Sequence, residues 1–172
     1  KQEKSVKGVN VYLGNIEATT TVVGFKKKRI FTEEVIGEEP LDLPPRSFPT
    51  VALWFDMPEG IEERLAASGL DFSGGLHAVE HAAIALLPLF ALCDRNDIGG
   101  LSTPVHHDTG KAEIFIYDAH PGGIGIAEKG FELITELWEA TLKAISECPC
   151  QEGCPSCIQS PKCGNNNEPL DK

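Results

Sequence analysis

One run of the chain reads Cys148-Pro-Cys150-Gln-Glu-Gly-Cys154-Pro-Ser-Cys157-Ile-Gln-Ser-Pro-Lys-Cys163 and contains five of the six cysteines. These thiols stand too close together for a set of long-range disulfides. Their spacing suits thiolates that converge on one tetrahedral metal ion, most simply zinc. Prolines and glycines interrupt the run and turn its backbone so that the sulfurs can point inward. We therefore predict a metal site near the C-terminal end.

A tetrahedral site needs four ligands, and this run offers five. The pair Cys154-x2-Cys157 has the standard zinc-knuckle spacing; Cys148 and Cys150 can complete the set, or Cys163 can replace one of them. A site closed by four cysteines has no open position for a substrate, so we expect a structural zinc that the tail 148–172 needs in order to fold. The alternatives are oxidation-prone free thiols and a coloured iron–sulfur cluster.

The composition is that of a globular protein of one domain, or one domain with a small appendage: 172 residues, 41% hydrophobic and 24% charged. No apolar run approaches the ~20 residues of a membrane span, because the longest, residues 82–93, is too short and contains Pro88. Without a secretory signal, the clustered cysteines indicate a reducing compartment. The start, Lys-Gln-Glu-Lys, suggests a fragment of a longer protein.

The formal net charge is −11, whereas a free-standing nucleic-acid binder is expected to present a basic face. The one basic cluster, Lys26-Lys-Lys-Arg29, is followed closely by the acidic residues Glu33, Glu34, Glu38 and Glu39. We interpret this cluster as a solvated strand or turn. On charge alone, the chain does not hold DNA by itself.

We predict an α+β fold with a β-rich segment at residues 1–58. Runs 9–13 and 18–25 have the β-branched content of strands, and Gly14-Asn15 between them suggests the turn of a hairpin. Prolines between residues 40 and 49 indicate an irregular connection. The apolar run 51–55 is then expected to be a buried strand.

An α/β core with two long helices is predicted over residues 59–147, ahead of the metal-binding tail 148–172. A short helix spans 59–67 and is closed by Gly69; a longer one, capped by Ser73, runs from 74 to about 93, where Cys93 is a small buried residue. A loop at 94–110 and a strand at 112–117 follow. The last element is a single helix over 124–147 with apolar residues at helical spacing.

The sequence His77-Ala-Val-Glu80-His81 matches the inverted zincin motif, H-x-x-E-H. Histidines at i and i+4 share a helix face and can both ligate zinc, with Glu80 beside them as a possible general base. A small zinc hydrolase or peptidase is therefore the alternative function. Against it, the motif fixes only three positions and no second helix offers an evident Glu ligand, so we favour a polar cluster at a buried helix start.

A third motif, Tyr117-Asp118-Ala-His120-Pro-Gly-Gly123-Ile-Gly125, leads from a strand into a helix. Its glycines and the helix N-terminus could receive an anion, but the P-loop Gly-Lys-Ser/Thr and the dinucleotide fingerprint are missing. Asp118 and His120 could form a hydrogen-bonded pair that involves a histidine of the 77–81 motif. A tight structural turn is the favoured interpretation. His106-His107, in a polar loop, is expected to face solvent.

Taken together and in order, three segments resemble the C-terminal zinc-binding domain of the MrfA-type and Hrq-type DEAD/DEAH-box helicases. They are Gly75-Leu-His77-Ala-Val-Glu80-His81, Ile114-Phe-Ile-Tyr117-Asp118 with His120-Pro-Gly-Gly, and the cysteine run with Gly164-Asn-Asn-Asn after it. The ending Gly164–Lys172 resembles the MrfA branch in particular. The resemblance covers residues 70–172 strongly and the β-rich start more weakly.

The resemblance implies a superfamily 2 ATP-dependent helicase that moves 3′→5′ on single-stranded DNA and serves DNA repair, in the cytoplasm with the nucleoid. This chain lacks the Walker A lysine, the DEAH box and the arginine finger, so ATP and Mg²⁺ would belong to a motor that lies N-terminal to it. What carries over is a non-catalytic accessory domain whose zinc is structural. Its expected partners are the motor domains of the same polypeptide and, through the whole protein, single-stranded DNA. A free-standing module that docks protein is a further alternative.

Overall fold

The structure, a computed structural model, describes residues 1–32 and 34–172. Along the chain the elements are β1 (Gln2–Val6), β2 (Val9–Thr20), β3 (Gly24–Lys28), β4 (Val35–Pro40), β5 (Arg46–Asp56), α1 (Ile61–Ala67), α2 (Phe72–Leu86), α3 (Pro88–Ala91), the 3₁₀ turn η1 (Arg95–Asp97), β6 (Ile98–Thr103), β7 (Glu113–Asp118), α4 (Ile126–Glu132) and α5 (Ile134–Glu147). The mixed α and β content confirms the predicted fold class.

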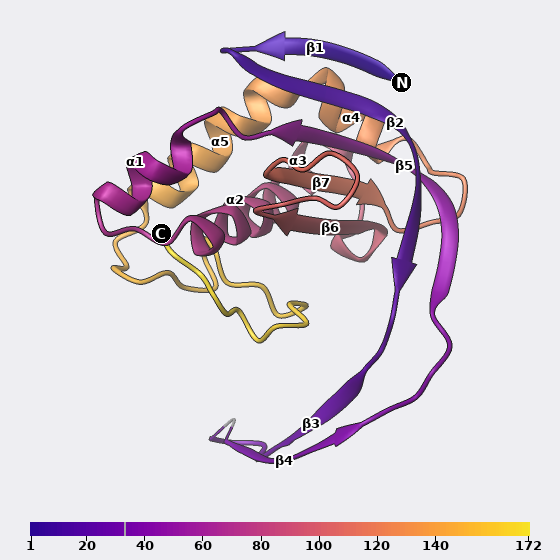
Figure 1. Cartoon of the computed structure of the whole chain (residues 1–172), viewed down its shortest axis with the longest axis vertical. Helices are drawn as coiled ribbons and strands as arrows, with labels where there is room; N and C mark the ends of the chain where they lie inside the picture. Colours follow the sequence, from indigo (N-terminus) through magenta and orange to yellow (C-terminus); the bar gives the residue numbers. More distant parts are fainter. Residues whose placement is uncertain (33) are drawn as a thin grey trace.

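Five strands form one antiparallel sheet in the order β1-β2-β5-β7-β6. Its three first strands come from the β-rich segment and its other two from the predicted α/β core, so the sheet joins both sides of residue 58. The domain boundaries themselves stay a prediction. In Figure 1 the helices gather beside this sheet, and the C-terminal tail runs below α2.

The main core lies between one face of the sheet and helices α2, α4 and α5. Alternate residues of the central strands point toward the helices, as the period of two along a strand requires. The buried residues that meet there include Val11, Leu13, Leu53, Phe55, Leu76, Ala83, Leu87, Ile114, Ile116, Ala127, Ile134 and Leu137. The predicted buried strand 51–55 is therefore confirmed as the C-terminal half of β5.

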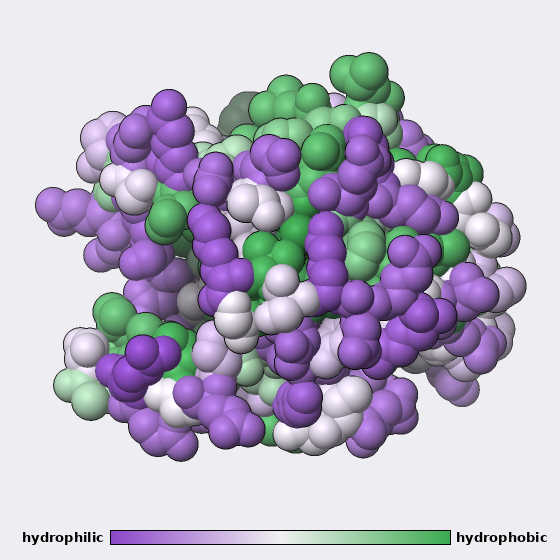
Figure 2. Space-filling view, turned by 90° about the horizontal axis from the view of Figure 1, so that it is seen from above, coloured by the Kyte–Doolittle hydropathy of each residue, from purple (hydrophilic) through white to green (hydrophobic). Residues whose placement is uncertain are grey.

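The opposite face of the sheet carries an aromatic ladder. The rings of Tyr12 and Trp54 stack at a centroid distance of 5.4 Å, and those of Trp54 and Phe115 at 5.6 Å. Such cross-strand aromatic pairs stabilise a sheet face that helices leave uncovered. Figure 2 shows the surface seen from above Figure 1, where hydrophilic residues predominate and apolar ones appear in patches between them.

The predicted turn at Gly14-Asn15 is wrong, because β2 runs unbroken from Val9 to Thr20 and pairs along its length with β5. The turn lies earlier, between β1 and β2. Gly14 serves packing: a Cβ there would stand 3.4 Å from the ring of Trp54, in tight contact. A glycine inside a strand thus marks a close approach of a large side chain.

The predicted loop 94–110 contains an unpredicted strand, β6, at the edge of the sheet. Gly99 and Gly100 remove the sequence signal for this strand, because glycine has low strand propensity. A Cβ on Gly99 would lie 2.3 Å from the Tyr117 ring, and one on Gly100 would lie 2.3 Å from Ile84. These glycines are there because the ring of the neighbouring strand and helix α2 press against β6.

Helix α2 begins two residues earlier than predicted. The cap is Asp71, whose carboxylate accepts from the amide of Ser73, and Ser73 lies inside the helix. The helix breaks at Leu87 because Pro88 cannot continue its hydrogen bonds. Counted through this break, residues 72–91 are long and apolar enough for a membrane span, contrary to the expectation, but half of that stretch is buried. Its buried side chains lie in the main core.

The predicted helix 124–147 is two helices, α4 and α5, that meet at Leu133, whose φ and ψ of −101° and 26° leave the helical range. Gly130 shortly before the break lets α4 lie against β5, because a Cβ there would stand 2.5 Å from the Leu53 side chain. The short helix α1 is confirmed. Glycine in α4 weakens a continuous helix and permits the change of direction.

A two-stranded hairpin, β3 and β4, extends away from the five-stranded sheet (Figure 1). It carries the basic cluster, whose Lys26 and Lys27 pair with Glu38 and Glu39 across the strands. The interpretation of this cluster as a solvated strand is therefore confirmed. The hairpin reaches the tail, where Lys28 Nζ donates to Asn166 Oδ1.

Candidate metal centre

Four cysteine sulfurs converge at the start of the tail. The Sγ atoms of Cys148 and Cys150 lie 3.5 Å apart, those of Cys148 and Cys154 3.6 Å, those of Cys150 and Cys157 3.5 Å, and those of Cys154 and Cys157 3.8 Å. All four atoms lie within 4.8 Å of one another. They form a compact cluster with a common centre.

Local backbone geometry aims these sulfurs. Helix α5 ends at Glu147 and delivers Cys148 as its extended C-cap. Gly153 then adopts a φ of +96°, in the left-handed region that favours glycine, and a Cβ there would stand 2.4 Å from the Ile158 side chain. The carbonyl of Cys154 accepts from the amides of Cys157 and Ile158, which closes the knuckle turn.

Two contacts fix the cluster to the rest of the molecule. Ile158 is fully buried and packs with Ala78 and Ala82 of α2 in a second small core. Lys172 Nζ donates to the carbonyls of both Cys148 and Cys150, each at 2.6 Å. Sequence reasoning missed Lys172, because no local signal marks a lysine that folds back over more than twenty residues.

The thiols differ in acidity. The backbone amide of Ser156, followed by the neighbouring thiols, lowers the pKa of Cys154 to about 7. Burial raises the pKa of Cys157 to about 11, although the amide of Cys154 donates to its sulfur at 3.3 Å. Thiolates are the form that binds metal. A cation at the centre would therefore favour the thiolate form of all four cysteines, including the buried Cys157.

The sulfur positions fit zinc. With Zn–S bonds of about 2.3 Å, the edges of a tetrahedral four-sulfur site measure about 3.8 Å, close to the observed 3.5–3.8 Å. In an iron–sulfur cluster each cysteine binds its own iron, or shares one, so the set of sulfurs spreads around several metal atoms. The geometry thus suits one ion with four thiolate ligands and no open position.

Cys163, the fifth candidate ligand, lies apart from this cluster. Its sulfur is 3.4 Å from His77 Nε2, and it forms a separate group of metal-ligating type with His77 and His81. The structure thus answers the question of which four cysteines come together: Cys148, Cys150, Cys154 and Cys157. The sequence signal for the second group was a leftover cysteine together with two histidines at i and i+4.

The other predicted polar residues separate into distinct roles. Glu80 accepts from the hydroxyl of Ser102 at 2.5 Å, and burial raises the pKa of its carboxyl. Asp118 is fully buried and accepts from four backbone amides, Ile124 to Ala127, at the start of α4. The helix N-terminus that could receive an anion is therefore filled by a side chain of this chain, and the structural turn is confirmed.

Asp118 and His120, which the sequence offered as a possible hydrogen-bonded pair, have other partners. His120 Nε2 instead lies 2.8 Å from Asp97 Oδ1, which lowers the pKa of Asp97. The expectation for the histidine pair in the loop is half correct. His107 is exposed, but the His106 ring packs on Phe115 with its centroid at 4.8 Å and is largely buried.

Comparison with known proteins relates this chain to helicases. The chain is 34% identical over 151 residues to the uncharacterized ATP-dependent helicase YprA of Bacillus subtilis, covering 87% of this chain and 20% of YprA. It is 30% identical over 174 residues to the ATP-dependent helicase HRQ1 of Saccharomyces cerevisiae, covering 95% of this chain and 16% of HRQ1. It therefore spans about a fifth of these proteins or less.

One short relative is aligned with this chain over most of its length. The uncharacterized protein MJ1572.1 of Methanocaldococcus jannaschii is 43% identical over 100 residues, which are 56% of this chain and 89% of that protein. Among solved structures, the DUF1998 helicase MrfA bound to DNA matches 98% of this chain and 22% of its own, with 31% identity and a TM-score of 0.67.

The model of the MrfA Zn-binding domain matches residues 79–158, from the middle of α2 to Ile158. That stretch contains the four converging cysteines and the strand that positions Asp118. The resemblance indicated by the sequence motifs is thereby confirmed. By its sequence, its fold and the family model, this chain belongs to the MrfA Zn-binding domain family.

Proposed function

We propose that this chain is the zinc-binding accessory domain of a superfamily 2 ATP-dependent DNA helicase and is not itself catalytic. The observation that carries the proposal is the match of 98% of the chain to part of the helicase MrfA in complex with DNA, at a TM-score of 0.67. The relatives YprA and HRQ1 are named ATP-dependent helicases. The chain corresponds to about a fifth of each, so the motor belongs to the remainder.

The proposed role of the metal is structural. Cys148, Cys150, Cys154 and Cys157 would hold one zinc ion, with Cys163 outside the set. Four thiolates saturate a tetrahedral zinc and leave no position for a substrate. The zinc would hold the tail on α2, where Ile158 packs between Ala78 and Ala82.

The surface that would meet the motor includes the β3–β4 hairpin. Apolar side chains cluster on this narrow arm, with Ile30 88% and Phe31 97% exposed, and further exposed apolar residues at Val22, Val23, Ile36, Leu41 and Leu43. A contiguous group of exposed apolar side chains marks an interaction surface. Packing on domains of the same polypeptide would cover them.

DNA contact would come through the whole protein. At a net charge of −11, the domain repels a phosphate backbone, and basic channels of a motor would supply the attraction. The 3′→5′ direction on single-stranded DNA, the role in DNA repair and a cytoplasmic location with the nucleoid are proposed from the resemblance to the MrfA-type and Hrq-type helicases. Clustered thiols also suit a reducing compartment.

The zinc hydrolase remains the competing proposal, and it has weaker support. It requires Glu80 as a general base beside a zinc on His77 and His81, but the Glu80 carboxylate is bound to the Ser102 hydroxyl. In the peptidase pattern the third protein ligand of the zinc is a carboxylate, whereas the side chain that meets the two histidines is Cys163.

The test uses the full protein that contains this domain. We expect ATP-dependent unwinding of a duplex with a 3′ single-stranded tail, and no ATP hydrolysis by the 172-residue chain alone. The double variant Cys154→Ser, Cys157→Ser should lose zinc and unwinding, while the matched control Cys93→Ser keeps both, since Cys93 lies outside the cluster. A full protein that fails to couple ATP hydrolysis to unwinding would overturn the proposal, and so would unwinding that survives the loss of zinc unchanged.

A further inference from the structure

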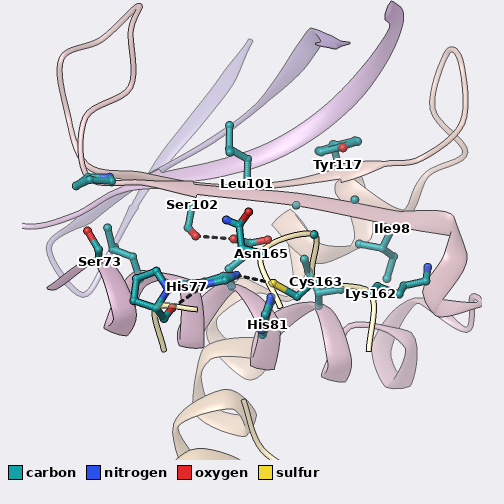
Figure 3. A pocket seen from close by; sticks show the side chains of 18 residues that line it. Ser73, His77, His81, Ile98, Leu101, Ser102, Tyr117, Lys162, Cys163 and Asn165 are labelled. Atoms are coloured by element: carbon teal, nitrogen blue, oxygen red, sulfur yellow. Dashed lines mark hydrogen bonds between the residues drawn. The ribbon is translucent and has the colours of Figure 1, made fainter. Parts of the chain in front are cut away.

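A second group of metal-ligating side chains lies on the other side of the tail from the four-cysteine cluster. His77 and His81 are one turn apart on α2, with ring centroids 4.1 Å apart. The tail brings Cys163 against them, so that its Sγ stands 3.4 Å from His77 Nε2. One donor atom from each of the three lies within 4.8 Å of the others, and Figure 3 shows the three side chains turned toward one another.

Both imidazoles are held by their far nitrogens. His77 Nδ1 lies 2.8 Å from the carbonyl oxygen of Pro169, and His81 Nδ1 lies 2.8 Å from that of Ile158. A carbonyl only accepts, so each Nδ1 carries a proton, and the neutral form of each ring has its lone pair on Nε2. A backbone carbonyl on one ring nitrogen is the arrangement that orients metal-binding histidines.

The three donors open onto a cavity of about 550 Å³ between α2, β6 and the tail. Its wall includes the polar side chains of Glu80, Ser102 and Lys162 (Figure 3). His81 itself is 6% exposed. The donors are thus sheltered on the helix side and accessible from the cavity side.

We propose that His77, His81 and Cys163 form a second metal site, which takes one divalent ion of the zinc class and leaves its fourth position open to the cavity. Imidazole and thiolate select zinc-like ions over magnesium or calcium, which prefer oxygen. With Zn–N of about 2.1 Å and Zn–S of about 2.3 Å, tetrahedral donors stand about 3.6 Å apart, near the 3.4 Å between Cys163 Sγ and His77 Nε2. Binding displaces the thiol proton of Cys163.

Three protein ligands and an open position distinguish this site from the closed four-cysteine site. Water or a small oxygen donor fits the fourth position from the cavity. The ion would also join the tail to α2 across 86 residues of sequence. The two sites thereby have different chemistry, one sealed and one able to exchange a ligand.

The proposed second site depends on the four-cysteine site through one hydrogen bond. The carbonyl that orients His81 belongs to Ile158, the neighbour of the cluster ligand Cys157. Loss of the four-cysteine site should release Ile158 and with it His81. Loss of Cys163 leaves the knuckle turn and the Ile158 packing intact. We therefore expect the second site to depend on the first, and the first to be independent of the second.

The test counts metal in the 172-residue chain, prepared without a histidine tag, which would itself bind metal. The chain is saturated with Zn²⁺, passed into zinc-free buffer by gel filtration and analysed by inductively coupled plasma mass spectrometry. We expect two zinc ions per chain, one in Cys163→Ser and one in His77→Ala. The matched control Cys93→Ser keeps two. Cys154→Ser should lose both.

Cobalt provides an independent readout, because thiolate-to-cobalt charge-transfer absorption reports the number of Co–S bonds. Cys163→Ser should lose about a fifth of that absorption, one bond in five, and His77→Ala should alter the d–d bands. One zinc per chain that Cys163→Ser leaves unchanged would overturn the proposal and reduce the contact to a thiol–imidazole hydrogen bond. The proposal would also be overturned by a second ion that washes off in zinc-free buffer or that remains in both Cys163→Ser and His77→Ala. Loss of both ions in Cys163→Ser would overturn it as well.

Discussion

Glu113 shows how a single residue is controlled by its surroundings. It opens β7 and is 1% exposed, next to Asp56 and His106. Burial raises the pKa of its carboxyl, while the hydroxyl of Thr109, which donates at 2.8 Å, acts in the opposite direction. From the sequence, Glu113 was one polar residue in a predicted strand. Nothing local indicated that its carboxylate is buried.

This burial predicts a pH dependence of stability. Because the folded pKa of Glu113 is raised, the folded state holds its proton more tightly than the unfolded state, and the free energy of unfolding falls as pH rises from the ordinary glutamate pKa through the raised value. Glu113→Gln removes the charge and keeps an acceptor for Thr109. Its stability relative to the wild type should therefore grow as pH rises above the ordinary glutamate pKa.

Urea denaturation at a series of pH values measures this difference, with Glu17→Gln, an exposed glutamate of β2, as the control. The control should follow the wild type at every pH. Equal pH profiles for Glu113→Gln and the wild type would show that burial does not perturb this carboxyl.

Where the helices and strands of this fold begin and end depends on long-range packing as much as on local sequence signals. The central strands and the short helix α1 were predictable, because apolar alternation and helical spacing are properties of neighbouring residues. The edge strand β6 was not predictable, because Gly99 and Gly100 are required by close contacts with Tyr117 and Ile84, which belong to other elements. The break between α4 and α5 has the same origin, with Gly130 against Leu53.

Helix α4 makes the next prediction. Its four N-terminal amides, from Ile124 to Ala127, donate to the two carboxylate oxygens of Asp118 over 2.5–3.3 Å. Asp118→Ala leaves the buried amides of Ile126 and Ala127 without this acceptor, which should lower the free energy of unfolding by about 2–4 kcal/mol. The measurement is chemical denaturation followed by tryptophan fluorescence. Asp108→Ala, at an exposed loop aspartate, should change stability little; a comparable loss there would argue against the capping role.

On the scale of the whole molecule, the chain contains two cores of different kinds. The main core joins the sheet to α2, α4 and α5 without any of the cluster cysteines. The second core consists of Ala78, Ala82, Cys157 and Ile158 and holds the tail to α2. Four buried residues supply little hydrophobic stabilisation, so we expect a bound metal to supply most of the stability of the tail.

Metal removal should therefore separate the two parts. After treatment with a strong chelator, trypsin should newly cleave at Lys162 and release the end of the tail, while the sheet and helices of the main core stay protected. Structural zinc in small units contributes on the order of 10 kcal/mol to folding, so the change in cleavage rate should be large. Mass spectrometry identifies the fragments, and readdition of Zn²⁺ is the control. A tail that stays protected without metal, or a core that unfolds with it, would contradict this division.

The sequence by itself determined the cysteine knuckle, the central strands and the membership of the family, because each depends on residues that are close together along the chain. The loops of one to three residues between Cys148, Cys150, Cys154 and Cys157 hold these thiols near one another whatever the rest of the fold does. The tertiary structure decided which cysteine is left out, since the choice depends on the path of the tail. That path places Cys163 against His77 and His81, 86 residues from His77. Contacts across such a distance arise only when the sheet, α2 and the tail have packed together.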